Sequence, residues 1–80
     1  MHCVSSYPTL DKDANINRLK SLSKISKYVL GYSDHTTNNI SGAYAFALGA
    51  RFFEKHFTVN KKLKGPDHKM SITPRELFSY

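Results

Sequence analysis

The chain has 80 residues, which is enough for one small domain or for part of a larger one. Twelve Lys and Arg residues against six Asp and Glu residues give a formal net charge of +6, which favours solubility or an anionic partner. A single cysteine excludes an internal disulfide framework. No apolar run approaches the length of a membrane span, and the N-terminus shows no secretion signal, so we expect a cytoplasmic protein without membrane contact.

The first half of the chain predicts two strands separated by a helix. Residues 1–5 form a short run that stops at Tyr7 and Pro8 and indicates a strand leading into a turn. The next apolar residues recur at helical spacing: Ile16, Leu19 and Leu22. We therefore expect an amphipathic helix from Asp13 onward, with Asp11 or Asp13 as its N-cap. Residues 28–32 predict the second strand.

The second half predicts another helix, a third strand, a loop and the start of a last helix. Asn38 or Asn39 is expected to cap the helix and Gly49 to end it. Its expected buried face consists of Ile40, Ala43, Ala47 and Leu48. Residues 51–58 predict a strand that places Phe52, Glu54 and His56 on one side and Phe53, Lys55 and Phe57 on the other. After a polar loop over 60–70, Thr73-Pro74-Arg75-Glu76 forms a capping box with proline at the first helical position.

This order of elements predicts an α/β protein with a parallel sheet. Two strand–helix–strand units in succession make the strands parallel, because each crossover returns the chain to the same end of the sheet. Three strands cannot close a barrel, and a parallel sheet needs cover on both faces. We therefore expect a piece of a larger α/β fold, with the order β-α-β-α-β-loop-α.

Polar side chains follow every predicted strand, at the end where α/β proteins carry their active sites. His35 and His56 end adjacent strands, about 4.8 Å apart, so two imidazoles could reach one metal ion. Asp34 and Glu54 flank them and could orient the imidazole N–H groups. On spacing alone, however, hydrogen-bonded strand-end histidines are the more common explanation for such a pair.

Four motifs in a fixed order make the pattern more specific. They cover residues 2–8 (HCVSSYP), 31–36 (GYSDHT), 54–58 (EKHFT) and 65–69 (GPDHK). With these motifs the chain closely resembles the sialic acid synthase family, N-acetylneuraminate synthase and its relatives, over essentially all 80 residues. The resemblance implies a partial (β/α)8 TIM barrel, with residues 1–80 as its last three strands in a single catalytic domain and no second domain.

The resemblance also implies a reaction and a site. The family condenses phosphoenolpyruvate with an N-acetylated amino sugar such as N-acetylmannosamine and releases phosphate, assisted by a divalent ion, Mn²⁺ or Mg²⁺. By motif, His35 and His56 correspond to the metal-binding histidines, and Glu54 is the candidate catalytic or supporting residue. The other matched positions correspond to substrate contacts: Tyr7 and Asp67 to the amino sugar, Ser33 and Ser5 to phosphoenolpyruvate.

Several alternatives stay open at this point. The family's phosphate-binding lysines come from earlier strands, so we expect the 80 residues alone to be inactive and to need the missing barrel portion or a second copy as partner. Sialic, legionaminic and pseudaminic acid synthases share this chemistry, so the sugar is not determined. The alternative from another class is a small, non-catalytic basic module that binds anions or another chain. The lysine run over 61–64 lacks interleaved aromatic residues, so we expect no nucleic-acid partner.

Overall fold

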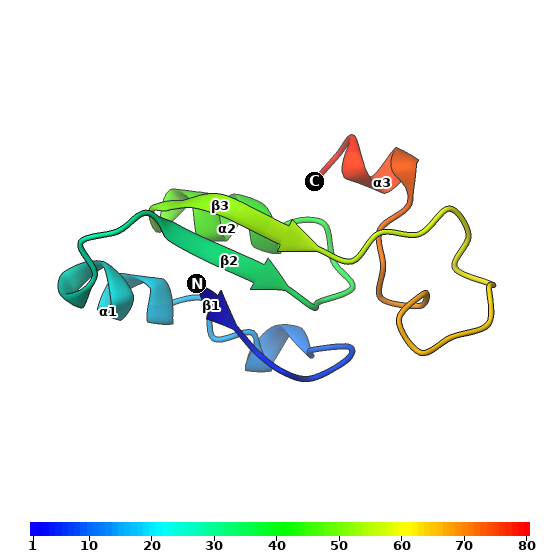
Figure 1. The fold of residues 1–80 in the computed structure, drawn as a ribbon, viewed down its shortest axis with the longest axis horizontal. Helices are drawn as coiled ribbons and strands as arrows, with labels where there is room; N and C mark the ends of the chain where they lie inside the picture. Colours follow the sequence, from blue (N-terminus) through cyan, green and yellow to red (C-terminus); the bar gives the residue numbers. More distant parts are fainter.

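The computed structural model describes all residues, 1–80, and contains one parallel sheet of three strands. The strands are β1 (His2–Cys3), β2 (Leu30–Asp34) and β3 (Ala50–Lys55), in the spatial order β1-β2-β3. Both neighbouring pairs are parallel, and the three strands lie side by side in Figure 1. The predicted parallel α/β arrangement is therefore confirmed, although each strand differs in length or position from its prediction.

Two helices cover one face of this sheet. They are α1 (Arg18–Ile25) and α2 (Ser41–Ala47), which connect successive strands (Figure 1). Each helix contributes one fully buried apolar side chain, Leu19 and Ala45, to a core that also contains Tyr32 and Ala50 of the strands. The helices are held by packing these residues against the sheet, because helices this short are marginal in water on their own.

Strand β2 lies two residues later than the predicted segment 28–32. Tyr28 and Val29 have the side chains that favour strands, yet they are 87% and 74% exposed and unpaired. The strand instead continues through Ser33 and Asp34, which pair with Glu54 and Lys55 of β3. The polar side chains are tolerated inside the sheet because each one finds a hydrogen-bond partner on the neighbouring strand.

Helix α1 begins at Arg18 rather than near Asp13, and the predicted aspartate caps are wrong. Residues Asp11–Asp13 form a separate 3₁₀ turn, η1. Asn15 then adopts a left-handed conformation, with φ of 50°, which breaks the backbone before a continuous helix can form. Asparagine tolerates this conformation better than most residues, so the polar segment that suggested a cap forms a corner instead.

Helix α2 ends just before Gly49 as predicted, but its N-cap residue is Ile40, with Asn38 in the turn just before it, and its predicted buried face is wrong. The Asn38 side chain accepts hydrogen bonds from the backbone N–H groups of Ile40 and Ser41 at 2.9 and 2.8 Å, and Gly49 has the positive φ, 101°, of a C-terminal glycine. Ile40, Ala43 and Ala47 are exposed, and Leu48 is half-buried. The fully buried residues are Ser41, Gly42 and Ala45, because a polar network and an aromatic ring occupy the space beneath the helix.

The predicted alternation of β3 is confirmed, whereas its predicted end at residue 58 is not. Pairing with β2 stops at Lys55, and beyond it Phe57 forms an isolated parallel bridge with Ile72. The bridge brings the loop over residues 60–70 back to the end of the sheet. Helix α3 (Pro74–Leu77) follows, and its capping box is present as predicted, with Thr73 and Glu76 bonding to each other's backbone N–H groups.

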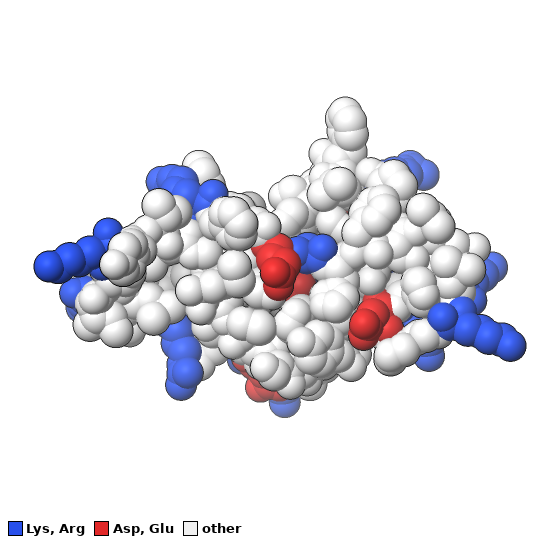
Figure 2. Space-filling model, viewed as in Figure 1, with Lys and Arg blue, Asp and Glu red and all other residues white.

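Charges on the surface are scattered. Figure 2 shows Lys and Arg side chains mainly toward the two ends of the long axis, with acidic side chains nearer the middle. This view therefore shows no continuous basic surface of the kind that tracks a nucleic-acid backbone. None of the helices has the length and apolar character required to cross a membrane.

Candidate functional site

The two predicted metal-binding histidines lie together at the carboxyl end of the sheet. His35 follows β2 directly and His56 follows β3 directly, one position beyond the last register pair, Asp34 with Lys55. Their ring centroids are 5.3 Å apart and their planes meet at 66°. The alternation of the strands places both imidazoles on the face that α1 and α2 do not cover.

A backbone hydrogen bond determines which nitrogen of His35 carries the proton. Nδ1 lies 2.8 Å from the carbonyl oxygen of Val4, and a carbonyl can only accept, so Nδ1 must be the protonated donor. In the neutral imidazole this leaves the lone pair on Nε2. His35 is only 5% exposed, so its orientation is well constrained. The arrangement resembles the support given to metal-binding histidines, whose second nitrogen donates to a carbonyl or carboxylate.

Tyr7 packs against both imidazoles. Its ring centroid is 4.2 Å from that of His35 and 5.8 Å from that of His56, with an edge-on arrangement in the second case. The turn after β1 thus brings a third predicted site residue to the histidine pair. Tyr7 is 52% exposed, so part of its side chain remains accessible beside the cluster.

Ser33 and Glu54 form the polar floor of the cluster. The Ser33 hydroxyl donates to the Glu54 carboxylate at 2.7 Å, and its oxygen lies 3.5 Å from Nε2 of His35. A serine has one proton to donate, and here Glu54 accepts it. The predicted contact between Ser33 and an anionic substrate therefore requires this hydroxyl to rotate away from Glu54.

Asp67 reaches the cluster from the loop after β3. Its carboxylate oxygen Oδ2 lies 3.9 Å from Nδ1 of His56. Its backbone carbonyl accepts hydrogen bonds from both the hydroxyl and the N–H of Ser71, at 2.7 and 3.1 Å. His68, next to it, pairs with the Thr58 hydroxyl at 2.7 Å, which ties the loop to the chain beyond β3. The structure thus brings Asp67, another predicted site residue, beside His56.

Ser5 is the predicted site residue that the structure does not bring into the cluster. It is exposed and joins none of these contacts. The suggestion that Asp34 and Glu54 orient the imidazole N–H groups is also wrong. Asp34 points to the opposite face of the sheet, Glu54 accepts from Ser33, and the carbonyl of Val4 orients His35.

The cluster fits a metal ion that takes two ligands from this chain. His35 presents an Nε2 lone pair, and His56 is 5.3 Å away between ring centroids. No group of three or more His, Cys, Asp or Glu side chains has metal-binding geometry. Two imidazoles leave further coordination positions open for water or substrate oxygens, an arrangement that catalytic metal sites use.

Behind the histidines, on the helix side of the sheet, lies a buried network that the sequence analysis did not anticipate. Asp34, fully buried, accepts hydrogen bonds at its carboxylate from Lys55, Ser41, Tyr32 and Tyr80, and from the backbone N–H of Thr36. A lysine facing the same side as Phe53 and Phe57 was the sequence signal, because a lysine buried among apolar neighbours needs an acidic partner.

The network holds the Asp34 carboxylate in its charged form. Burial opposes ionisation, but the hydrogen bonds from Lys55, Ser41 and the Thr36 N–H outweigh it and hold the pKa of Asp34 below its usual value. Burial and the neighbouring Asp34 charge both raise the pKa of Tyr32 and of Tyr80. Both phenols therefore remain protonated donors under all ordinary conditions.

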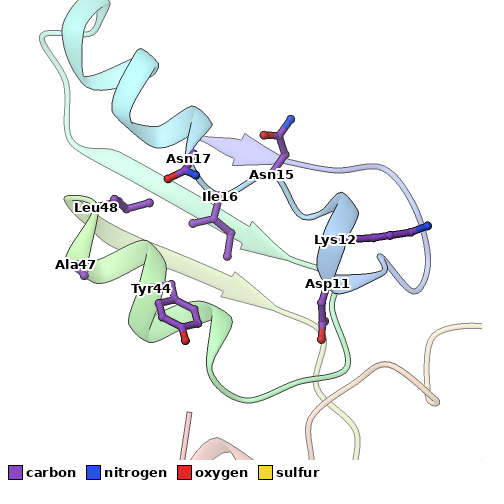
Figure 3. A pocket seen from close by; sticks show the side chains of 8 residues that line it. All are labelled: Asp11, Lys12, Asn15, Ile16, Asn17, Tyr44, Ala47 and Leu48. Carbon is purple, nitrogen blue, oxygen red and sulfur yellow. The ribbon is translucent and has the colours of Figure 1, made fainter.

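An open groove on the helix side is a second concave feature. Figure 3 shows it between the turn at η1, the start of α1, and α2, with Ile16 directed into the space and Lys12 directed away. Its lining consists of Asp11, Lys12, Asn15, Ile16, Asn17, Tyr44, Ala47 and Leu48. It contains no histidine, cysteine or hydroxyl nucleophile beyond the Tyr44 phenol, so the histidine cluster is the stronger candidate site.

Comparisons with known proteins converge on one family. The NeuB family profile matches residues 1–79. The chain is 44% identical over 77 residues to N,N'-diacetyllegionaminic acid synthase of Campylobacter jejuni and 45% identical over 78 residues to N-acetylneuraminate-9-phosphate synthase of Drosophila melanogaster. Each alignment covers 96% of this chain and respectively 23% and 21% of the relative, so the chain spans less than a quarter of those proteins.

Solved structures give the same result. The chain superposes on the N-acetylneuraminic acid synthetase of Leptospira borgpetersenii, solved in complex with citrate, with a TM-score of 0.87 and 41% identity. That match covers 94% of this chain and 26% of the synthetase. The partial-barrel architecture predicted from the sequence is therefore confirmed.

Proposed function

Because the chain belongs to the NeuB family, we propose that it supplies the metal-binding half of a sialic acid-type synthase active site. The complete site is expected to condense phosphoenolpyruvate with an N-acetylated amino sugar; water adds at the former enol carbon and phosphate leaves, giving a nine-carbon sialic acid-type sugar acid. The observation that supports this most directly is the pair of imidazoles at the strand ends, 5.3 Å apart between centroids, with Tyr7 beside them and Asp67 3.9 Å from His56.

His35 and His56 are the residues that would hold a divalent ion, Mn²⁺ or Mg²⁺. When bound, such an ion supplies Lewis acidity at the sugar aldehyde, which makes the carbonyl carbon more electrophilic toward the enol carbon of phosphoenolpyruvate. The chain's own contribution is to fix the orientation of the imidazoles before the ion binds. The Val4 carbonyl keeps the proton of His35 on Nδ1, so that Nε2 presents its lone pair without any rearrangement.

The remaining residues of the cluster bind and orient the substrates. Asp67 and Tyr7 lie above the histidines, where their carboxylate and hydroxyl can bind the hydroxyl groups of the amino sugar. Orientation of two substrates in one site accounts for a large share of the rate enhancement in condensations of this kind. Ser33 is suited to donate to phosphoenolpyruvate once its hydroxyl leaves Glu54, and Glu54 is then free to accept a proton or a substrate hydroxyl.

The structural match also limits what these residues can do alone. The chain covers 26% of the superposed synthetase, and its sheet has three strands. We therefore expect the purified chain to show no condensation activity by itself. Activity is expected to require the other barrel strands, which would contribute the groups that bind the phosphate.

A chimera tests this proposal. Residues 1–79 would replace the matching segment of the Campylobacter jejuni synthase, and product formation would be followed by mass spectrometry. The chimera is expected to retain activity. His35→Ala in the chimera is expected to lower kcat by about 100-fold or more, because losing a metal ligand should cost at least as much as the 10–100-fold lost with a residue that supports one. A folded chimera that is inactive, or a His35→Ala chimera that is fully active, would contradict the proposal.

The matched control is His68→Ala in the same chimera. His68 lies in the loop after β3, and its imidazole forms a hydrogen bond with the Thr58 hydroxyl instead of packing against the other histidines. A third chimera carries His56→Ala. A loss of kcat in the His35→Ala and His56→Ala chimeras alone would show that the effect belongs to the site. An equal loss with His68→Ala would indicate a general effect of removing a histidine.

A further inference from the structure

The residues immediately before the two histidines are bonded to each other on the other side of the sheet. Asp34 precedes His35 and Lys55 precedes His56, and the two are register partners of β2 and β3. The Lys55 ammonium donates to the Asp34 carboxylate at 2.8 Å, and the two side chains are 4% and 0% exposed. Because side chains alternate along a strand, the ion pair and the imidazoles lie on opposite faces.

Lys55 also forms a hydrogen bond with Thr36, the residue that follows His35. Its ammonium donates to the carbonyl oxygen of Thr36 at 2.8 Å, while the N–H of Thr36 donates to Asp34 at 2.9 Å. The residue before His35 and the residue after it are thus both tied to the lysine that precedes His56. The backbone that carries one imidazole is thereby attached to the backbone that carries the other, just where the sheet pairing ends.

Tyr80 closes this network from outside. Its hydroxyl donates to Asp34 at 2.9 Å, and its ring lies 5.2 Å from the Lys55 ammonium. The ring also sits against Gly42 of α2, where any side chain would overlap it. Ser41 of the same helix donates to Asp34 as well. The Asp34 carboxylate therefore accepts hydrogen bonds from α2, from β3 and from Tyr80.

A buried ion pair is not needed for stability alone. The loss of hydration of two buried charges offsets most of their attraction, and apolar replacements are often as stable. What the pair provides is a defined geometry, because its bonds are directional. We propose that the Asp34–Lys55 ion pair, completed by Tyr80, is a positioning device that sets the distance and orientation of His35 and His56 for metal binding. The metal in this proposal rests on the proposed function.

The test uses the full 80-residue chain and Co²⁺ as probe, with visible absorption reporting both affinity and ligand geometry. Asp34→Asn and Lys55→Met are each expected to weaken Co²⁺ binding about tenfold, the usual size of such supporting effects. The matched control is Lys61→Met. Lys61 also bonds a carboxylate, that of Glu76, at 2.7 Å, but this pair is partly exposed and joins the loop beyond β3 to α3. Lys61→Met is expected to leave Co²⁺ binding unchanged.

The double variant Asp34→Asn/Lys55→Met separates positioning from simple stabilisation. It removes both charges, so no unpaired charge stays buried and the fold is expected to recover stability relative to the single variants. Its Co²⁺ affinity is nevertheless expected to stay low. A folded double variant with the affinity and spectrum of the original chain would overturn the proposal. If the single variants fail to fold, Tyr80→Phe tests the proposal instead, because it removes only the hydrogen bond to Asp34. A smaller loss of Co²⁺ affinity is then expected, and an unchanged affinity would contradict the proposal.

A second readout works without metal. Nuclear Overhauser effects between the ring protons of His35 and His56, whose centroids are 5.3 Å apart, report the relative placement of the two imidazoles. The double variant is expected to weaken or lose these effects, and unchanged effects would overturn the positioning role. If the original chain fails to bind Co²⁺, the metal in the proposed function is refuted, whereas the ring-to-ring measurement still decides the positioning role.

Discussion

Replacing Gly42 with alanine is expected to destabilise the chain, even though alanine is the better helix former. A methyl group at Gly42 would lie 2.6 Å from Cζ of Tyr80 and 2.8 Å from its hydroxyl oxygen, closer than any real contact. The ring must therefore move, and its hydroxyl then leaves the Asp34 carboxylate. A hydrogen bond to a charged acceptor contributes about 1.5–3 kcal/mol, and the half-buried position of Tyr80 favours the lower end.

The helix itself would gain from the substitution. Alanine is favoured over glycine by about 1 kcal/mol inside a helix, and by less in the first turn, where Gly42 lies. The net effect is then a destabilisation of about 1 kcal/mol, equivalent to a fall in Tm of about 4–8 °C for a domain of this size. Urea unfolding followed by circular dichroism measures the change.

Gly42→Ala in a Tyr80→Ala background tests the reasoning, because the change in the free energy of unfolding should then have the opposite sign. With the ring removed, nothing opposes the new methyl group, and Gly42→Ala is expected to stabilise the chain by about 0.5–1 kcal/mol. Gly42→Ala that is equally stabilising with and without the ring would refute the argument, because it would show that Tyr80 does not rest on α2.

Three further predictions concern other parts of the chain. Leu19→Ala should lower the free energy of unfolding by about 2–5 kcal/mol, because Leu19 is fully buried in a core with few other large side chains, and a loss below about 1 kcal/mol in urea unfolding would contradict that packing. Thr73→Ala should cost about 1 kcal/mol locally, seen as faster hydrogen exchange in α3, since it removes the side chain that accepts from the Glu76 N–H. Hydrogen bonds from Lys61 and from the backbone of Thr73 lower the pKa of Glu76 to about 2, so its stabilisation of α3 should be complete above the ordinary carboxyl pKa, near 4.5, and lost as the pH falls toward 2. A Glu76 carboxyl that titrates near 4.5 by NMR in the original chain would disprove this, and Lys61→Met is expected to raise its pKa.

The order and type of the elements could be predicted from the sequence because they depend on local patterns. The alternation of β3, the glycine that ends α2 and the capping box at Thr73 each rest on residues within a few positions of one another. The predicted strand ends placed His35 and His56 together, since parallel strands deliver their ends to one edge.

Two of the errors share a physical origin, which is that buried side chains depend on partners far away in the sequence. Ser33 and Asp34 looked like a loop because nothing local satisfies them, yet Glu54 and Lys55 do so across the sheet. The buried face of α2 was misassigned for the same reason. Its small residues lie inward because Tyr80, 38 positions from Gly42, fills the space that a larger side chain would need.

The most direct test of the account is a Mn²⁺ titration of the chain, followed by electron paramagnetic resonance. The account predicts that one Mn²⁺ ion binds per chain, that His35→Ala and His56→Ala each weaken binding at least about tenfold, and that His68→Ala leaves it unchanged. Mn²⁺ binding that is absent from the folded chain, or that is indifferent to both His35 and His56, would contradict the claim that these strand ends form a metal site.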